Sequence, residues 1–306
     1  MRALVTGAAG FVGARLARRL AAAGWDVEGW ARPAVDLADR ASTAAAARAA
    51  EVDVAFLLAA ARAEATPPER AATTAVNATS LLWLADALPA RCRTIVRLGS
   101  STEYGAAAGP MDESTPVRPR GFFGATKAAG GLLLDAAVAA GNGVAGNGVA
   151  GPARRAVHMR AFQVYGPGDR PHRFVPALLR AAATGERLPL TAPGFRRDWV
   201  YVDDVVEACV AAALADHLPP GCVLNVGTGR QWANEEVVAV AERVTARPIA
   251  ADPGAYPGPA WDTASWVCDP SRARDLLGWE AKVELEEGLR RGWAARHGAP
   301  GVATGA

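Results

Sequence analysis

A short apolar run at the N-terminus leads directly into a glycine-rich turn and then into a helical pattern. The run Arg2–Thr6 predicts a strand, the turn reads TGAAGFVG, and 11–23 has the spacing of an amphipathic helix. Gly7 permits a tight turn, Gly10 lets a phosphate approach the backbone, and Gly13 lets helix and strand pack closely. The free N–H groups and the dipole of the helix start favour an anion there. The segment therefore predicts the first unit of a dinucleotide-binding domain.

The first 160 residues repeat this alternation of strand and helix. Four further strands are predicted, at Val27–Ala31, Asp53–Leu58, Thr94–Leu98 and Ala156–Arg160. Helical patterns lie between them, at 39–50, 71–88 and 121–140. Strands separated by helices favour a parallel, doubly wound sheet that binds its ligands at the carboxyl ends of the strands. We predict an α/β fold of the Rossmann type.

The pattern becomes looser after residue 165, where Pro and Gly are frequent between short helices. Those helices are predicted at 174–184, 204–215, 234–245 and 271–277, and strands at Asp198–Val202 and Cys222–Val226. We predict a dinucleotide-binding domain at 1–165, to which 201–226 returns, and a mainly substrate-binding region at 166–306. The tandem GNGVA repeat at 140–151 predicts a flexible loop, without a function, at the sheet edge opposite the ligand.

Composition narrows the classes of protein that remain. Lys+Arg 33 against Asp+Glu 31 gives a net charge of +2, with no basic stripe, which argues against a nucleic-acid partner. No apolar stretch reaches about 18 residues without a charge or a breaker, and the N-terminus enters a strand at once. Neither the four cysteines nor the four histidines have metal-ligand spacing. We expect a cytoplasmic protein with no signal peptide, membrane span or metal.

The end of the second predicted strand bears on the choice of cofactor. A carboxylate there would bind the adenosine 2′-hydroxyl of NAD, but this chain has Ala31 followed by Arg32. A guanidinium can bind a 2′-phosphate with two hydrogen bonds. The pattern favours NADP(H), while NAD(H) remains possible if Arg32 is only a solvated loop charge.

These motifs resemble those of the extended short-chain dehydrogenase/reductases, in the NAD-dependent epimerase/dehydratase group that acts on nucleotide sugars. The resemblance covers nearly the whole length and includes GSSTEYG at 99–105, FGATK at 123–127, RAFQVYGPG at 160–168 and RRDWVYVDDV at 196–205, together with Asn77. It implies cofactor contacts from Gly7, Gly10, Phe11, Val12, Gly13, Arg32, Asp36, Leu37, Leu58, Ala59, Ala60 and Lys127.

The resemblance also implies three catalytic positions, which are Ser100, Phe123 and Lys127. In the family the lysine binds the nicotinamide ribose and lowers the pKa of a tyrosine one turn away, which acts as general acid and base. That tyrosine is Phe123 here, and its ring has no proton to exchange. Three explanations stay open: Ser100 or a water carries the proton, the protein binds without turnover, or Phe123 is an engineered Tyr→Phe change.

Other departures concern the substrate. Sugar 4,6-dehydratases of the family carry an acidic residue at the position where this chain has Thr102. The acid of this chain, Glu103, is one residue further along, and on an extended segment its side chain would point to the opposite face. Dehydration is therefore disfavoured. The resemblance implies substrate contacts from Ser101, Thr102, Gln163, Tyr165 and Arg197, of which Arg197 would bind the pyrophosphate. A second pyrophosphate arginine is missing, because GPAWD stands at 258–262.

The sequence predicts NAD(P)-dependent reduction or epimerisation at a carbonyl or hydroxyl carbon of a nucleotide-activated sugar or deoxysugar, with a 4-ketoreductase favoured. The alternatives are a cofactor-binding protein with lost or altered catalysis and a reductase of a non-sugar carbonyl. The resemblance further implies a homodimer that pairs the helices at 71–88 and 121–140.

Overall fold

The main sheet of the computed structural model, which describes residues 1–61, 66–107, 109–143, 153–258 and 262–297, has six parallel strands in the order β2-β1-β3-β4-β5-β9. Their bounds are β1 Arg2–Thr6, β2 Asp26–Trp30, β3 Val54–Leu57, β4 Thr94–Ser100, β5 Arg155–Ala161 and β9 Cys222–Val226. The chain passes from β1 to β2 on one side and then to β3 on the other. That reversal places the ligand crevice at the carboxyl ends of β1 and β3. The Rossmann-type prediction is confirmed.

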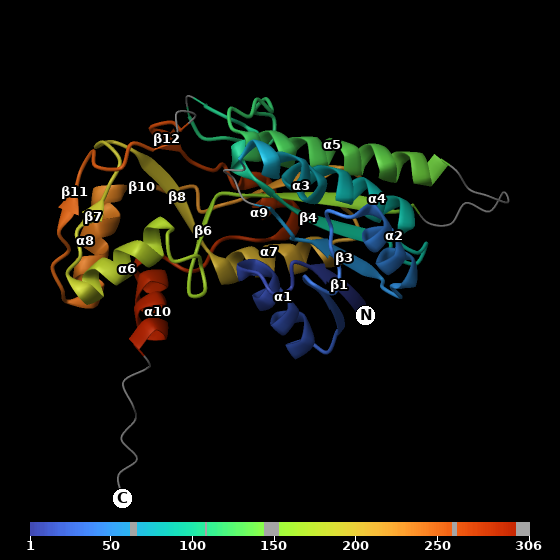
Figure 1. Cartoon of the computed structure of the whole chain (residues 1–306), viewed down its shortest axis with the longest axis horizontal. Helices are drawn as coiled ribbons and strands as arrows, with labels where there is room; N and C mark the ends of the chain where they lie inside the picture. The colour runs from blue at the N-terminus through green and yellow to red at the C-terminus, as the bar shows by residue number, and fades with distance from the viewer. Residues whose placement is uncertain (62–65, 108, 144–152, 259–261, 298–306) are drawn as a thin grey trace, which may run out of the picture.

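Helices cover both faces of this sheet (Figure 1). One face carries α1 (Phe11–Ala22) and α7 (Val202–Leu214), and the other carries α2 (Arg40–Ala49), α4 (Ser80–Ala87) and α5 (Phe122–Gly143). Leu16 and Leu20 of α1 pack with Val205 of α7 in one core, while Leu84 and Leu134 belong to the core on the opposite face. The periodic apolar residues of each helix therefore face the sheet.

The helix predicted at 71–88 is not continuous. The short turn η1 (Pro67–Glu69) and α3 (Arg70–Thr74) precede a π-helical segment, η2 (Ala75–Thr79), from which α4 continues. Such π segments occur often at functional sites. Here the segment contains Asn77, which is buried.

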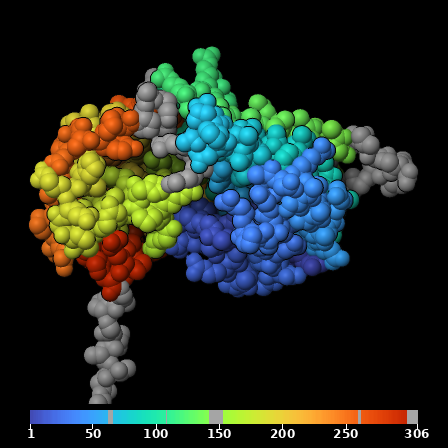
Figure 2. Space-filling view, viewed as in Figure 1, coloured from blue at the N-terminus to red at the C-terminus, as the bar shows by residue number. Residues whose placement is uncertain are grey.

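A second, smaller sheet supports the C-terminal region. Its central strand β8 (Arg196–Tyr201) pairs with β10 (Gln231–Ala233), β12 (Ser265–Trp266) and β6 (Gln163–Tyr165). A two-stranded sheet pairs β7 (Leu188–Pro189) with β11 (Ala251–Asp252), and the helices are α6 (Phe174–Thr184), α8 (Asn234–Thr245), α9 (Ser271–Leu277) and α10 (Leu285–His297). The chain crosses back between the two parts, because α7 and β9 belong to the main sheet. Figure 2 shows the blue N-terminal surface beside the yellow and orange C-terminal one.

Asp198 on β8 joins distant parts of the second region. Its fully buried carboxylate accepts hydrogen bonds from the amide and hydroxyl of Thr228 (2.8 and 2.7 Å), the amide of Gly229 (2.9 Å) and the amide of Cys268 (3.1 Å). Burial raises the pKa of this carboxyl, although the four donors oppose that effect.

The long helix α5 combines length with low polarity. Its stretch Phe122–Gly141 is long and apolar enough to cross a membrane by length and composition alone, and it packs here against α4, β4 and β5. The helix extends to Gly143, so the first residues of the GNGVA repeat are helical rather than part of the expected loop. The rest of the repeat, 144–151, lies outside the described residues.

Candidate active site

The glycine-rich turn forms a cradle that has no room for side chains. Gly7 adopts a left-handed φ of +70°, and a Cβ on Gly13 would overlap the carbonyl oxygen of Gly7. Gly10 is the N-cap of α1, where no side chain bonds the free backbone N–H groups. Thr6 Oγ1 accepts from the amides of Leu58 (3.1 Å) and Ala59 (3.2 Å), which fixes the end of β1 to the end of β3. The cradle fits a dinucleotide pyrophosphate.

A depression of about 330 Å³ opens beside this cradle. It is lined by Ala9, Gly10, Phe11, Ala14, Arg15, Arg18, Pro167 and Gly168. Arg15 bridges the two parts of the molecule, because its guanidinium donates to the carbonyl of Pro167 (2.5 Å) and to Asp203 (3.2 Å). Arg15 and Arg18 make the depression positive, as an anionic ligand requires. Neither arginine is among the predicted site residues, although their i, i+3 spacing directly after the glycine turn is visible in the sequence.

The adenosine end of the crevice has no carboxylate at the strand terminus. Trp30 ends β2, and its indole donates to Glu28 (2.7 Å), so this acid is already bonded. Arg32 is exposed, and Leu37 is buried in the core between helices and sheet. Asp36 Oδ1 accepts from the amide of Ala38 (2.9 Å) within its own turn. Among the described residues, Arg32 is thus the first charged side chain after the end of β2.

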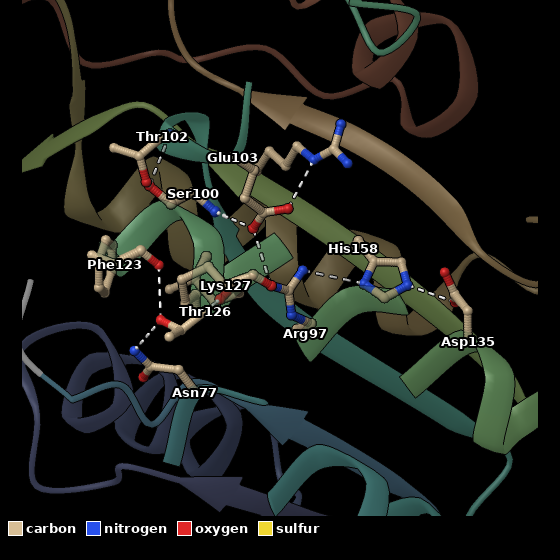
Figure 3. A network of polar contacts seen from close by, with 12 residues as sticks. Asn77, Arg97, Ser100, Thr102, Glu103, Phe123, Thr126, Lys127, Asp135 and His158 are labelled. Atoms are coloured by element: carbon tan, nitrogen blue, oxygen red, sulfur yellow. Dashed lines mark hydrogen bonds and ion pairs between the residues drawn. The ribbon is translucent and has the colours of Figure 1, made fainter. Parts of the chain in front are cut away.

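The predicted catalytic positions lie together, at the end of β4 and in the first turns of α5 (Figure 3). Ser100 ends β4, and its Oγ accepts from the hydroxyl of Thr102 (2.8 Å) and from the Thr102 amide (3.2 Å). Phe123 and Lys127 are one turn apart on α5, and the Phe123 ring is partly exposed. A Cβ on Gly124 would overlap the carbonyl oxygen of Thr102, so the helix start lies directly on the turn after Ser100.

Asn77 connects this helix to the end of β3. Its Nδ2 donates to Thr126 Oγ1 (3.0 Å), whose hydroxyl donates to the Phe123 carbonyl (2.9 Å), and its Oδ1 accepts from the Ala61 amide (2.8 Å). A Cβ on Gly130 would overlap the carbonyl oxygen of Asn77. The π-helical segment and α5 are thus in backbone contact, which sets the height of α5 above the strand ends.

Lys127 is almost completely buried. Its Nζ donates to the carbonyl of Leu98 (2.5 Å), two residues before Ser100. Burial lowers the pKa of Lys127 to about 7, with a further contribution from the Arg97 guanidinium, while Glu103 opposes both. An amine with this pKa can hold or release a proton near neutral pH.

Glu103 lies beneath this site between two arginines. Its Oε1 accepts from Arg97 (3.0 Å) and from the Ser100 amide (3.0 Å), and its Oε2 accepts from Arg160 (3.1 Å). Burial alone would raise the pKa of Glu103, but the two guanidinium groups more than offset it, so the pKa is below its usual value. Residues 101–103 form a 3₁₀ turn, η3, and the expected extended segment is wrong; the turn directs Glu103 inward.

Arg97 extends the buried network in two directions. Its Nη2 donates to the main-chain carbonyl of Lys127, and its Nη1 lies 3.5 Å from His158 Nδ1. His158 Nε2 lies 2.8 Å from Asp135, which is partly exposed on α5. The sequence analysis missed Arg97 and Arg160, although a charged residue inside each of two apolar strands was a visible signal.

Two of the predicted substrate residues are engaged inside the protein. Tyr165 is completely buried, with its ring against Gly288 of α10 and its hydroxyl 3.5 Å from the Leu285 carbonyl. It belongs to the second core, which corrects the expected substrate contact. Arg197 is buried and donates to Asp262 (2.6 Å), and its pyrophosphate role stays a prediction.

The other predicted substrate residues differ in exposure. Ser101 is buried, and its hydroxyl accepts from the indole of Trp266 (2.8 Å), so it too is occupied inside the protein. Thr102 and Gln163 remain partly exposed. Among the residues described, no group of three or more His, Cys, Asp or Glu side chains could hold a metal ion. All four cysteines are free and buried.

Comparisons with known sequences connect this geometry to a family. The model of the NAD dependent epimerase/dehydratase family matches residues 3–227. The UDP-glucose 4-epimerase of Mycolicibacterium smegmatis is 30% identical, over 95% of this chain and 97% of that protein. The dTDP-6-deoxy-L-talose 4-dehydrogenase (NAD(P)(+)) of Kitasatospora kifunensis is 30% identical, over 70% of this chain and 65% of that protein.

Solved structures give the same result. The UDP-glucose 4-epimerase of Thermus thermophilus, in complex with NAD, superposes with a TM-score of 0.82 at 27% identity, covering 98% of this chain and 100% of that one. MoeE5, in complex with UDP-glucuronic acid and NAD, gives a TM-score of 0.80 at 27% identity, covering 97% and 99%.

Proposed function

The chain belongs to the NAD-dependent epimerase/dehydratase family, an extended short-chain dehydrogenase/reductase, and on that premise we propose that it reduces the 4-keto group of a nucleotide-activated deoxysugar with NADPH. The family makes it an NAD-dependent oxidoreductase or epimerase. The choice of reductase rests on one observation above all, the exposed Arg32 at a strand end without a carboxylate. A reductase needs a reduced cofactor that exchanges at every turnover.

The position of Glu103 supports reduction over dehydration. Dehydration requires an acid that can give up its proton beside the substrate. Glu103 is buried, ionised and bonded to Arg97 and Arg160, and the neighbouring positions 101 and 102 are hydroxyl residues. Positions 101–103 therefore offer no acid with a proton to give for the elimination of water.

The residues around the crevice have separate tasks in this reaction. The cradle at Gly7, Gly10 and Gly13 would hold the pyrophosphate, Arg32 the 2′-phosphate and Lys127 the nicotinamide ribose. A bound nicotinamide supplies or accepts a hydride. Ser100 Oγ accepts from Thr102, and its own O–H would donate a hydrogen bond to the substrate oxygen.

The direct test is consumption of NADPH with a dTDP- or UDP-linked 4-keto-6-deoxyhexose. We expect stoichiometric oxidation of NADPH and formation of a single alcohol at C4, identified by NMR. If the sugar is not consumed but aliphatic ketones are, the non-sugar carbonyl reductase would replace this proposal. If the protein binds the nucleotide sugar and NADPH without any turnover, it would be a binding protein.

Epimerisation at C4 is the second candidate. It is favoured by the match to the M. smegmatis UDP-glucose 4-epimerase over nearly the full length of both chains. An epimerase keeps its cofactor and changes no net redox state. Conversion of UDP-glucose to UDP-galactose without added cofactor, by protein purified with NAD bound, would select this activity.

We further propose a cytoplasmic homodimer that pairs α4 and α5 with their copies. Support comes from the exposed face of α5, where Ala125, Ala129, Leu132 and Ala136 recur at helical spacing and Leu132 is 70% exposed. Light scattering should give twice the chain mass of 31.6 kDa in dilute buffer. The monomer mass would contradict the dimer.

A further inference from the structure

Reduction of a carbonyl requires a proton at its oxygen, and Phe123 cannot supply one. The hydroxyl of Thr126 already donates to the main-chain carbonyl of Phe123. Within the described part of the chain, the other candidate donors around this position are Ser100 at the end of β4, Thr102 and Glu103 on η3, and Lys127 on α5 (Figure 3). Each can be judged as a proton donor by its contacts and its acidity.

Three of the four are unsuited. The hydroxyls of Ser100 and Thr102 bond to each other at 2.8 Å, and aliphatic hydroxyls are far weaker acids than the groups that exchange protons near neutral pH. Glu103 is ionised and accepts from two guanidinium groups and one amide, so it has no proton to give and no exposed oxygen.

We propose that the Nζ of Lys127 itself gives and takes the substrate proton in this chain, and that Arg97 is the positioning residue that keeps the amine suited to that task. The inference rests on the proposed function. In the reducing direction, the carbonyl carbon takes a hydride, the carbonyl oxygen takes a proton as an Nζ–H bond breaks, and the lysine is left neutral. Water then returns a proton to Nζ.

The geometry around Nζ supports this assignment. Among the described residues, the Leu98 carbonyl is the one acceptor that the Lys127 Nζ bonds. The other N–H bonds of the amine therefore have no acceptor in the described part of the protein and can be donated to a substrate oxygen. The nearby carboxylate, Glu103, is bonded to Arg97 and Arg160 instead. The lowered pKa of Lys127, about 7, is consistent with a group that exchanges protons at neutral pH.

Arg97 acts from behind the lysine. Its guanidinium donates to the main-chain carbonyl of Lys127 and to the carboxylate of Glu103. On the opposite side of the guanidinium lies His158, which is paired with Asp135. A fixed cation at this place favours loss of a proton from Nζ. The charged groups that act on Lys127 are Arg97 from β4 and Glu103 from η3.

The first test measures the lysine directly, without turnover. Lys127 and Lys282 are the only lysines, so lysine labelled with ¹³C at Cε gives two NMR signals, and Lys282→Arg assigns them. We expect the Lys127 signal to titrate near pH 7, rather than near the ordinary lysine value of about 10.4. Titration near pH 10 would overturn the proposal.

Variants of Arg97 sharpen this measurement. Arg97→Met removes the cation and should move the Lys127 midpoint up by about one pH unit. Arg97→Lys keeps the charge and should leave the Lys127 midpoint close to the wild-type value, with the new lysine giving a third signal. The matched control is Arg155→Met, which removes another buried arginine at the opposite end of the adjacent strand β5 and should have no effect. If Arg97→Met is folded and the Lys127 midpoint is unchanged, Arg97 is not a positioning residue. The role of Lys127 is decided separately, by its titration in the wild-type protein.

The second test uses the reaction. Reduction of a nucleotide 4-ketosugar should slow tenfold per pH unit above the Lys127 midpoint, and Arg97→Met should move that limb by the same amount as the NMR midpoint, with little change in KM. Turnover that is independent of pH from 6 to 9, or that persists in Lys127→Met, would show that water supplies the proton. Absence of turnover with every nucleotide 4-ketosugar, beside a normal lysine titration near pH 7, would instead contradict the proposed function.

Discussion

The cofactor cradle and the second sheet are stabilised in different ways. In the cradle, the contacts that require glycine at positions 10 and 13 join residues three to six apart, namely Gly7 with Gly10 and Gly13. In the second sheet, Asp198 bonds residues 30 and 70 positions away, and Arg197 bonds Asp262. Local contacts leave a motif in the sequence, whereas distant polar contacts do not. The two regions should therefore respond differently to substitution.

The largest effect is expected in the cradle. Gly13→Val adds a branched side chain where even a Cβ overlaps the Gly7 carbonyl oxygen. We expect loss of detectable NADPH binding and a destabilisation of about 3 kcal/mol or more. Isothermal titration and urea unfolding measure the two effects. Gly141→Ala, on an exposed part of α5 with no atom near the added Cβ, is the matched control and should be neutral.

The second sheet should be most sensitive at Asp198. Asp198→Ala removes the shared acceptor of the Thr228, Gly229 and Cys268 amides, of which the Cys268 amide is buried, and this should cost about 3 kcal/mol in the free energy of unfolding. Asp216→Ala, whose side chain is 97% exposed, should change stability by less than about 1 kcal/mol. Equal stability of the two variants would contradict the organising role of Asp198.

Lys127 should affect stability in a pH-dependent way. The pKa of Lys127 is about 7 in the folded state, below that of a lysine in the unfolded chain. Between about pH 7 and 10 the unfolded chain therefore binds a proton that the folded protein does not, and the free energy of unfolding of the wild type should rise with pH over this range. Lys127→Met should remove this rise and be more stable than wild type at pH 7, by on the order of 3 kcal/mol. Urea unfolding at pH 7 and 9.5 measures the stability of the wild type and of Lys127→Met. The same change in stability with pH in both proteins would argue against a buried neutral amine.

Restoring a phenol tests the catalytic departure. Phe123→Tyr adds one oxygen to a partly exposed ring one turn from Lys127, whose charge favours the phenolate. We expect turnover on a nucleotide 4-ketosugar to rise about tenfold, or about 1.4 kcal/mol. The phenol would then carry the proton and leave Lys127 to bind the ribose. Lys127→Met in this background should abolish the gain, and no gain would mean that the site no longer accommodates the family's acid.

An effect of the same size is expected in the choice of cofactor. We expect NADPH to bind about tenfold tighter than NADH, a difference of about 1.4 kcal/mol, because Arg32 follows β2 without a carboxylate. Ala31→Asp should shift the preference toward NADH. Fluorescence titration measures both affinities, and equal affinities in the wild type would contradict the role of Arg32.

Much of the first half could be predicted from the sequence, because periodicity fixes strands, helices and the glycine turn. The π-helical segment at Asn77 and the 3₁₀ turn at 101–103 could not, since both depend on tertiary contacts rather than on local preference. The burial of Tyr165 and the pairing of Arg197 with Asp262 were missed for the same reason. Their partners lie 65 or more positions away and carry no motif.

At Gly130 the backbone of α5 lies so close to the π-helical segment that even a methyl group would not fit between them. Any side chain there would lift α5 from the π-helical segment, and Phe123, Thr126 and Lys127 would move with it as one body. Their mutual spacing would survive while the whole set withdrew from the strand ends. Variation at residue 130 would thus act on the width of the crevice, and on every ligand bound there, without altering a single residue that touches the ligand.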